Sequence, residues 1–315
     1  MLQYMIILLD DTSTSFCHYE VNKSERRLIG LDNLRAGIRL AMIENLTIQF
    51  VYPDYDLPQE YKEVINTIDH SDIMPLTNSP QGTDVITLDG WGSPVETQNL
   101  ASQIVVIRTT LNDLLAHGDD VAALLSTVQR LNVVITDVEK FHKDLQGLYS
   151  SWLETVGQEV EKLYINGKAT QFNLLTDRMM LTSMNNCGAG DTCITLAPNG
   201  KFYVCPAFYY ESPVDSVGDL VDGINIPNKQ LYKLNFAPIC RECDAWHCKR
   251  CIWLNHKMTL EVNTPGHEQC VMAHLERNIS RDLLTSIRKM GRFLPENPDI
   301  PKLDYLDPFD KIINK

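Results

Sequence analysis

The chain has 315 residues, of which 44% are hydrophobic, and it carries a formal net charge of −13. This length and hydrophobic content are enough for two domains' worth of buried core. The negative charge argues against binding to nucleic acid, whose phosphates it would repel. No apolar stretch approaches the roughly 20 residues that a membrane-spanning helix needs, so we expect no membrane partner either.

The N-terminus has the pattern of a buried strand and not of an export signal. The segment Met-Leu-Gln-Tyr-Met-Ile-Ile-Leu-Leu-Asp-Asp has no basic residue before its short apolar run, whereas a secretory signal begins with a basic segment. Cysteines of a protein that stays in a reducing compartment remain thiols. We therefore expect a cytoplasmic protein.

Continuous apolar runs, which are typical of parallel strands covered on both faces, recur along the first half of the chain. They span residues 5–9, 46–52, 84–88, 104–108 and 132–136. Helical patterns lie between them, the first capped by Asp32 and the second beginning near Pro58. Two further helices are predicted over 111–116 and 121–131.

Alternating strands and helices imply parallel strands joined by right-handed crossovers. Five or six such units are too few for a closed eight-stranded barrel, so we predict an α/β fold that forms a partial, open TIM-like barrel. Asp10 and Asp11 end the first strand, where barrel enzymes place their chemistry. Adjacent side chains of a strand point to opposite faces, so at most one lines the barrel mouth. A turn or helix-capping role is the alternative.

Two long helical segments are predicted in the second half. The first, over 138–166, is a candidate link between domains, and its apolar face consists of Phe141, Leu145, Leu148, Trp152 and Val156. The second, over 264–290, has an apolar face made of Leu275, Ile279, Leu283 and Ile287. The remaining residues, 291–315, are proline-rich and acidic, a composition that builds no core by itself. They either cover the domain surface or dock on a partner.

Eight of the nine cysteines lie in one block of the sequence. Their positions are Cys187, Cys193, Cys205, Cys240, Cys243, Cys248, Cys251 and Cys270. Four thiolates hold one zinc ion or one iron–sulfur cluster, so eight are enough for two sites. His247 and His256 flank the densest part of the block, but eight cysteines already suffice as ligands. We expect each histidine to donate a hydrogen bond near a ligand or to be exposed.

Several kinds of site compete for these thiols. A disulfide framework needs an oxidising compartment, for which the N-terminus gives no sign. Structural zinc suits the two Cys-x2-Cys pairs, but zinc ribbons separate such pairs by more than the four residues between Cys243 and Cys248. Inert buried cysteines would not be expected to cluster in this way. Bunched cysteines closed by a remote one favour iron–sulfur ligation.

A hairpin is predicted inside the cysteine block. Pro198-Asn199-Gly200 separates two β-type runs, and Asn-Gly is a strong turn signal because both residues tolerate positive φ. The hairpin would bring Cys193 and Cys205 onto neighbouring strands, where one metal centre could bridge them. Pro206 then ends the second strand, because proline cannot donate to the ladder.

The block resembles the SPASM domain, the auxiliary-cluster extension of many radical S-adenosylmethionine peptide-modifying enzymes. The matching features are Cys187, Gly200 and Cys205, the knot from Cys240 to Cys251, and the distant Cys270. The last two gaps of the knot, four and two residues, are each one residue shorter than is usual in that family. The resemblance implies two [4Fe-4S] clusters, with zinc as the alternative metal. It assigns Cys187, Cys193, Cys205 and Cys251 to the first cluster, and Cys240, Cys243, Cys248 and Cys270 to the second.

The loop after the first strand lacks the cluster motif of a radical S-adenosylmethionine enzyme. Such an enzyme has three cysteines spaced Cys-x3-Cys-x2-Cys, but here Ser13 and Glu20 stand on either side of the single Cys17. Hydroxyl and carboxylate groups are poor substitutes for thiolates on such a cluster. The glycine-rich cosubstrate motif is also missing after the second strand. We therefore expect no S-adenosylmethionine binding. The alternative is an unrelated α/β domain with one chance cysteine.

The degenerate loop together with the cysteine block resembles the CXXX repeat peptide maturases of bacterial systems for ribosomally made, modified peptides. The resemblance is strongest over residues 5–20 and 187–270. It implies a degenerate barrel over 1–180, a SPASM-like domain over 181–290 and a tail over 291–315. It also implies a cysteine-repeat precursor peptide and a radical enzyme as partners in a heteromeric complex.

The function we expect is that of a partner subunit that does not cleave S-adenosylmethionine. It would present the precursor peptide or relay electrons to the radical enzyme. The alternatives are a complete maturase acting through its auxiliary clusters or Cys17, and a zinc-stabilised peptide-binding module. Whether the chain has an activity of its own is left open by the sequence.

Overall fold

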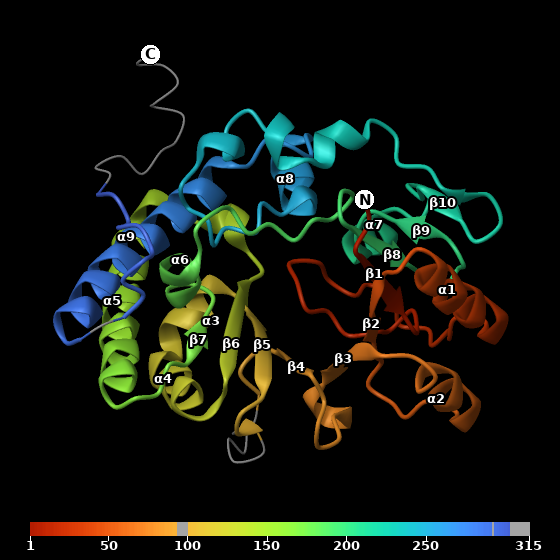
Figure 1. The fold of residues 1–315 in the computed structure, drawn as a ribbon, viewed down its shortest axis with the longest axis horizontal. Coiled ribbons are helices and arrows are strands. Elements are labelled where there is room, and N and C mark those ends of the chain that lie inside the picture. Colours follow the sequence, from red (N-terminus) through yellow and green to blue (C-terminus); the bar gives the residue numbers. More distant parts are fainter. Residues whose placement is uncertain (93–99, 292, 303–315) are drawn as a thin grey trace. The chain divides into compact units, whose positions relative to one another are not determined.

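The computed structural model describes residues 1–92, 100–291 and 293–302 (Figure 1). The chain forms two compact units whose segments alternate along the sequence. Unit 1 contains residues 1–88 and 187–237, and unit 2 contains residues 89–186 and those from 238 onward. The domain boundaries expected from the sequence, 1–180, 181–290 and 291–315, stay a prediction. Residues 303–315 of the expected tail lie outside the described residues.

Unit 1 is built on a mostly parallel sheet. In chain order its strands are β1 (Tyr4–Leu8), β2 (Thr47–Val51), β3 (His70–Pro75), β4 (Val85–Asp89), β8 (Cys193–Leu196) and β9 (Phe202–Tyr203). Their order across the sheet is β4-β3-β2-β1-β8-β9. Pairing is parallel between β1 and each of β2 and β8, and antiparallel between β8 and β9. Strand β1 is therefore internal, which explains why its residues after Tyr4 are all buried.

The helices of unit 1 follow the expected alternation only in part. Helix α1 (Leu31–Ile43) connects β1 to β2, and helix α2 (Gln59–Ile65) connects β2 to β3. Between β3 and β4 there is only the 3-10 turn η1 (Leu76–Asn78). The expected cap at Asp32 was wrong, because Gly30 precedes α1 without any side-chain hydrogen bond and Asp32 lies in the first turn.

The hairpin predicted around Asn199-Gly200 is confirmed. Strands β8 and β9 pair with Thr195 opposite Tyr203 and Leu196 opposite Phe202. Gly200 has φ +78°, a backbone conformation that favours glycine, and a Cβ atom there would also displace the end of the Asn33 side chain. Helix α7 (Pro206–Glu211) follows, and then a small antiparallel pair, β10 (Gly218–Asp219) with β11 (Gly223–Ile224). Two 3-10 turns, η4 (Lys229–Tyr232) and η5 (Leu234–Phe236), complete the unit.

Unit 2 combines a parallel sheet with most of the helices. The strands β5 (Ile104–Thr109), β6 (Arg130–Ile135) and β7 (Gln171–Phe172) pair in parallel in the order β7-β6-β5. The first helical elements are α3 (Leu111–Ala116), α4 (Gly118–Thr127), η3 (Val138–Lys140), α5 (Lys143–Ile165) and α6 (Thr176–Met180). The cysteine knot then brings η6 (Cys240–Glu242), α8 (Ile252–Thr259) and α9 (His267–Lys289). In the described residues no helix is long and apolar enough to cross a membrane.

The long helix α5 buries the expected face only in part. Trp152 and Val156 are buried, but Leu148 is 60% exposed and Tyr149 is fully buried. The helical segment is broken around Phe141, and α5 begins only at Lys143. Its buried positions are therefore spaced from Tyr149 at three- and four-residue intervals.

Candidate metal centres

The eight clustered cysteines are divided between the two units. Unit 1 contains Cys187, Cys193 and Cys205, and unit 2 contains the other five. No disulfide bond joins any of the nine cysteines, all of which lie in the described part of the chain. The second expected ligand set lies wholly within unit 2. The first set combines three residues of unit 1 with Cys251 of unit 2, and both assignments stay predictions.

The hairpin holds two of the unit 1 thiols close to each other in register. Continuing the β8–β9 pairing by two residues places Cys193 opposite Cys205, although the ladder itself ends at Tyr203. Burial, with the nearby charge of Cys187, raises the pKa of the Cys193 thiol to about 12. Cys187 itself is exposed.

Three thiols of unit 2 are electrostatic neighbours in the knot. Cys240 begins the 3-10 turn η6 and is 8% exposed; burial and then the charge of Cys243 raise the pKa of its thiol to about 11. Burial also raises the pKa of Cys243 and Cys248, and Cys248 is affected by both other thiols. Burial, and after it the charge of neighbouring thiols, favours the protonated form of Cys240 and Cys248.

The other two cysteines of unit 2 lie at helix starts. Cys251 is the residue before α8, and its sulfur accepts a hydrogen bond from the backbone N–H of Leu254 at 3.5 Å. Cys270 lies in the first turn of α9, where its N–H donates to the Gly266 carbonyl. Helix N-termini favour a thiolate over a thiol, so both positions suit metal ligands.

Buried positive charge accompanies the thiols of unit 2. The side chains of Arg178, Arg250 and Arg277 are at most 2% exposed. Arg277 Nη1 lies 2.6 Å from Asp244 Oδ1, and Arg178 Nε donates to the Asp244 carbonyl at 2.7 Å. Burial lowers the pKa of Arg178 to about 10, although the charges of Asp244 and Cys243 act in the opposite direction.

The balance of charge in this part of unit 2 fits an anionic metal–thiolate centre. Three buried guanidinium groups lie there with two carboxylates, those of Asp244 and Glu276. Isolated buried charges are costly unless they are paired, and metal-bound thiolates would add negative charge. The nearby positive charge of Arg250 acts to lower the pKa of Cys240 and so favours its thiolate.

Histidines contribute polar contacts beside these thiols. His274 Nε2 lies 3.6 Å from Cys243 Sγ. His247 is buried, and its Nε2 lies 2.8 Å from Glu276 Oε2; its role beside a metal ligand stays a prediction. Tyr149 donates to the other oxygen of Glu276 at 2.6 Å.

The donor set therefore fits a metal centre in its chemistry, burial and charge. Over the described residues, however, no three His, Cys, Asp or Glu side chains converge closely enough to hold a metal ion. Any metal would have to draw the thiols together. It would also supply the positive charge that keeps them deprotonated.

The loop after β1 is arranged quite differently. Ser13 is fully buried; its hydroxyl accepts a hydrogen bond from the Asp10 N–H at 2.9 Å and donates one to the Val51 carbonyl at 2.7 Å. Cys17 is partly exposed and Glu20 is exposed. These three positions therefore do not form a common donor set, because the first is used to join the loop to β2.

Both acids at the end of β1 are buried and have partners within unit 1. Asp10 accepts hydrogen bonds from the Thr12 N–H at 2.8 Å and from the Tyr55 hydroxyl at 2.9 Å, the turn-stabilising role considered above. Asp11 accepts a hydrogen bond from the Tyr209 hydroxyl and pairs with Arg27 at 2.9 Å. Sequence reasoning missed Tyr209 because it lies nearly two hundred residues from Asp11, and no local pattern connects them.

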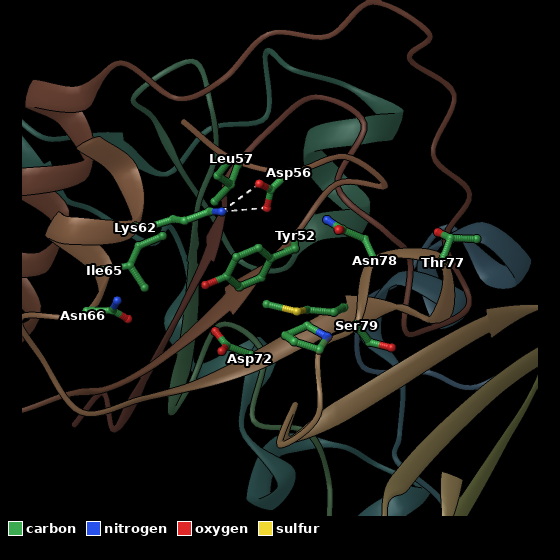
Figure 2. Close-up of a pocket in the computed structure, with 12 residues that line it drawn as sticks. Tyr52, Asp56, Leu57, Lys62, Ile65, Asn66, Asp72, Thr77, Asn78 and Ser79 are labelled. Carbon is green, nitrogen blue, oxygen red and sulfur yellow. Dashed lines mark hydrogen bonds and ion pairs between the residues drawn. The ribbon is translucent and has the colours of Figure 1, made fainter. Parts of the chain in front are cut away.

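A pocket in unit 1 was not predicted from the sequence. It has a volume of about 570 Å³ and lies among β2, α2, β3 and the turn after β3. Figure 2 shows Tyr52 in its middle, between the Asp56–Lys62 ion pair and Asp72. Tyr52 directly follows β2, at the place where the sequence lacks the glycine-rich cosubstrate motif.

The chain has an α/β fold with a mostly parallel sheet, and known structures share this arrangement. Solved structures of a protein named anSMEcpe share it. Native anSMEcpe with bound AdoMet has a TM-score of 0.61 at 13% identity, covering 91% of this chain and 100% of that one. The hexahistidine-tagged form with bound AdoMet has a TM-score of 0.63 at 12% sequence identity, and the match covers 93% of this chain and 97% of that one. The native form with bound AdoMet and the Cp18Cys peptide has a TM-score of 0.62 at 12% sequence identity, and the match covers 91% of this chain and 99% of that one.

At this level of identity the likeness shows the fold alone. It confirms the predicted α/β fold with mostly parallel strands. The partial barrel of radical-enzyme type and the SPASM assignment of the cysteine block stay predictions. No family model matches the sequence. No curated protein matches it either.

Proposed function

We propose that this chain is an iron–sulfur partner subunit in a ribosomal-peptide maturation system and does not cleave S-adenosylmethionine. It would present a cysteine-repeat precursor peptide, or relay electrons, to a radical enzyme in a heteromeric complex. The observation that carries the proposal is the contrast between Ser13 and the knot. In a fold of radical-enzyme type, the position of a cluster ligand is occupied by a buried, hydrogen-bonded serine, while buried thiols gather elsewhere.

The residues proposed to hold metal are the eight clustered cysteines, in the two sets implied by the SPASM resemblance. When bound there, [4Fe-4S] clusters would supply one-electron chemistry. Arg178, Arg250 and Arg277 would balance the negative charge of the set in unit 2, and the contact from His274 would orient Cys243. Grouped thiols of this kind persist in a reducing compartment, which supports a cytoplasmic location.

Anaerobic purification with quantification of iron, sulfide and zinc tests the proposal. We expect about eight irons and eight sulfides per chain, from four thiolates per four-iron cluster. The same preparation, reduced and given S-adenosylmethionine, should form no 5′-deoxyadenosine above a buffer control. Stoichiometric zinc without iron–sulfur absorbance would overturn the metal assignment. Cleavage that persists after removal of contaminating radical enzymes would overturn the partner role in favour of a complete maturase.

A zinc-stabilised peptide-binding module is the second candidate. It is favoured by the 3.6 Å separation of Cys243 Sγ and His274 Nε2, since zinc accepts mixed cysteine and histidine ligands. X-ray absorption at the zinc edge would decide, because three sulfurs and one nitrogen around zinc require a histidine ligand. An iron–sulfur spectrum with His274→Ala unchanged in metal content would reject this candidate.

A further inference from the structure

The crossover between β3 and β4 is unusually short. Only nine residues, 76–84, connect these parallel strands, and they contain the turn η1 but no α-helix. Parallel strands normally need a crossover of a dozen or more residues, usually helical. The crossovers before and after β2 do carry helices, α1 and α2. Successive right-handed crossovers place their helices on the same face of a sheet, so residues 76–84 supply no α-helix beside α2.

The pocket of unit 1 lies beside this position. Its walls come from four segments: the residues after β2, the second half of α2, strand β3, and the turn from Thr77 to Pro80 (Figure 2). The volume of about 570 Å³ falls within the range of ligand-binding pockets, roughly 300–1,000 Å³. It has room for a side chain together with flanking peptide.

The uncovered strand has a polar outward face. On β3, His70 and Asp72 are partly exposed, whereas Ile73 is buried. Strands alternate their side chains between two faces, so His70 and Asp72 share one face with Met74. A strand covered by a helix would be apolar there. This face of β3 therefore carries two polar, partly exposed side chains beside the buried Met74.

One carboxylate of the pocket lacks a strong partner for one of its oxygens. Asp72 Oδ1 is shielded from solvent and accepts no hydrogen bond, and the nearest basic atom is His70 Nε2 at 3.4 Å. Burial raises the pKa of Asp72, although the hydrogen bond from Tyr52 acts in the opposite direction. Lys62 forms an ion pair with Asp56 at 2.7 Å and not with Asp72.

The segment around the pocket carries much of the negative charge of the protein. Residues 53–84 contain seven carboxylic acids and one lysine, a net charge of −6 out of −13 for the whole chain. A concentrated field of one sign attracts ligands of the opposite sign and speeds their association. The occupant that suits this pocket is therefore positively charged.

We propose that the pocket binds a basic side chain, lysine or arginine, of a peptide, with the ammonium or guanidinium group paired to Asp72. The flanking peptide would occupy the groove left by the missing crossover helix. This deepens the proposed function by naming the surface that receives a peptide, and it rests on that proposal only for the source of the peptide.

Fluorescence anisotropy with labelled synthetic nonapeptides tests the inference on the full-length protein. The peptides share one sequence with arginine, glutamine or glutamate at the centre. We expect the arginine peptide to bind at least tenfold more tightly than the glutamine peptide, because a charge-assisted hydrogen bond is lost. Equal affinities would overturn the proposal. Free arginine amide that binds as tightly as the peptide would overturn the part concerning peptide.

Variants locate the site. Asp72→Asn should remove the preference for arginine, and the control Glu60→Gln, an exposed acid of α2 outside the pocket lining, should keep it within about twofold. Lys62→Gln should strengthen binding of the arginine peptide severalfold, because it leaves Asp56 unpaired beside the pocket. This second variant keeps the test valid if Asp72→Asn fails to fold. A preference that survives in Asp72→Asn, or no gain in Lys62→Gln, would overturn the proposal.

Iron content measured on the same samples separates the two hypotheses. Loss of peptide selectivity with about eight irons present would overturn the pocket and leave the iron–sulfur proposal standing. Selective binding of the arginine peptide by a protein without iron would support the pocket and overturn the iron–sulfur proposal.

Discussion

The loop after β1 and the cysteine knot of unit 2 illustrate two states of a site in one chain. In the loop, Ser13, Asp10 and Asp11 each have hydrogen-bond or ionic partners within unit 1. In the knot, buried thiols lie beside an excess of buried guanidinium groups, and no three metal-binding side chains of the described residues converge. The polar groups of the loop are thus satisfied within unit 1, whereas the knot gathers thiols that we propose as metal ligands.

The largest effect should follow from changing the knot. Cys248→Ser removes a half-buried thiol of the proposed second ligand set, so we expect iron to fall from about eight to about four per chain. We also expect the loss of stability to exceed the roughly 2–5 kcal/mol of a large core truncation, because metal binding here is also folding free energy. Iron analysis and urea unfolding measure both quantities.

Cys17→Ser is the matched control for that experiment. It lies in the loop and is partly exposed, so iron content and unfolding midpoint should stay unchanged. If Cys248→Ser bound as much iron as the wild type, Cys248 would not be a metal ligand, and the proposed contrast between the loop and the knot would be wrong.

A smaller effect is expected when the loop loses one of its own partners. Asp11→Asn weakens the acceptor used by Tyr209 and Arg27, and a hydrogen bond to a charged group contributes about 1.5–3 kcal/mol. Urea unfolding should show a loss of about 2 kcal/mol with no change in iron content. The exposed Asp32→Asn serves as the control. A fall in iron in Asp11→Asn would mean that the loop and the metal centres are not independent.

Restoring the missing cysteines should not restore catalysis. In the double variant Ser13→Cys and Glu20→Cys, the first side chain lies where it bonds the Val51 carbonyl, and the second lies at an exposed position. We expect no 5′-deoxyadenosine above the level of wild type and only about 1 kcal/mol of destabilisation from the lost hydroxyl bonds. Formation of 5′-deoxyadenosine by the double variant would show that the loop is still able to assemble a cluster.

The smallest expected effect is a pH dependence of peptide binding. It follows from a contrast between two carboxylates of unit 1, one fully hydrogen-bonded and one not. Asp10 has both oxygens hydrogen-bonded, whereas Asp72 Oδ1 has no hydrogen bond. Burial raises the pKa of Asp72 from 3.8, so the carboxylate is protonated at a higher pH than usual. Binding of the arginine peptide should therefore weaken as the pH falls, with a midpoint above 3.8.

His70, Asp84 and Tyr52 are the other titratable groups near Asp72. The midpoint should persist in His70→Gln, which removes the only histidine among them, and should disappear in Asp72→Asn. Binding that does not depend on pH between about 4 and 7 in wild type would leave Asp72 without a role. Anisotropy measured across that range is sufficient for the test.

The sequence predicted elements whose pattern is local. All five apolar runs became strands, and Asn199-Gly200 marked the hairpin, because burial on both faces and positive φ each leave a direct signature. Strand β3 was missed because its outward residues, His70 and Asp72, are polar in the absence of a covering helix. Leu148 was misassigned because its four-residue spacing from Trp152 in α5 suggested a common buried face, whereas its side chain is 60% exposed.

Only the part of the candidate site that is visible in the spacing of the cysteines could be predicted from the sequence. The cysteines identified a region of metal chemistry, but the arginines around the knot come from segments far apart in the sequence, such as Arg178 and Arg277. The hydrogen bond from Tyr209 to Asp11 likewise joins segments far apart in the sequence. Such pairings depend on tertiary packing, which leaves no periodic signal along the chain.

The position of β1 has a consequence for synthesis of the protein. Its pairing partner β8 includes Thr195, opposite Ile6, and so emerges from the ribosome nearly two hundred residues later. At about 5–20 residues per second, that delay is roughly 10–40 s. During this time one side of a largely buried strand of unit 1 has no partner from its own chain, and unpaired apolar strand edges promote aggregation. Yield in a cell should therefore depend on chaperones that bind the nascent N-terminus.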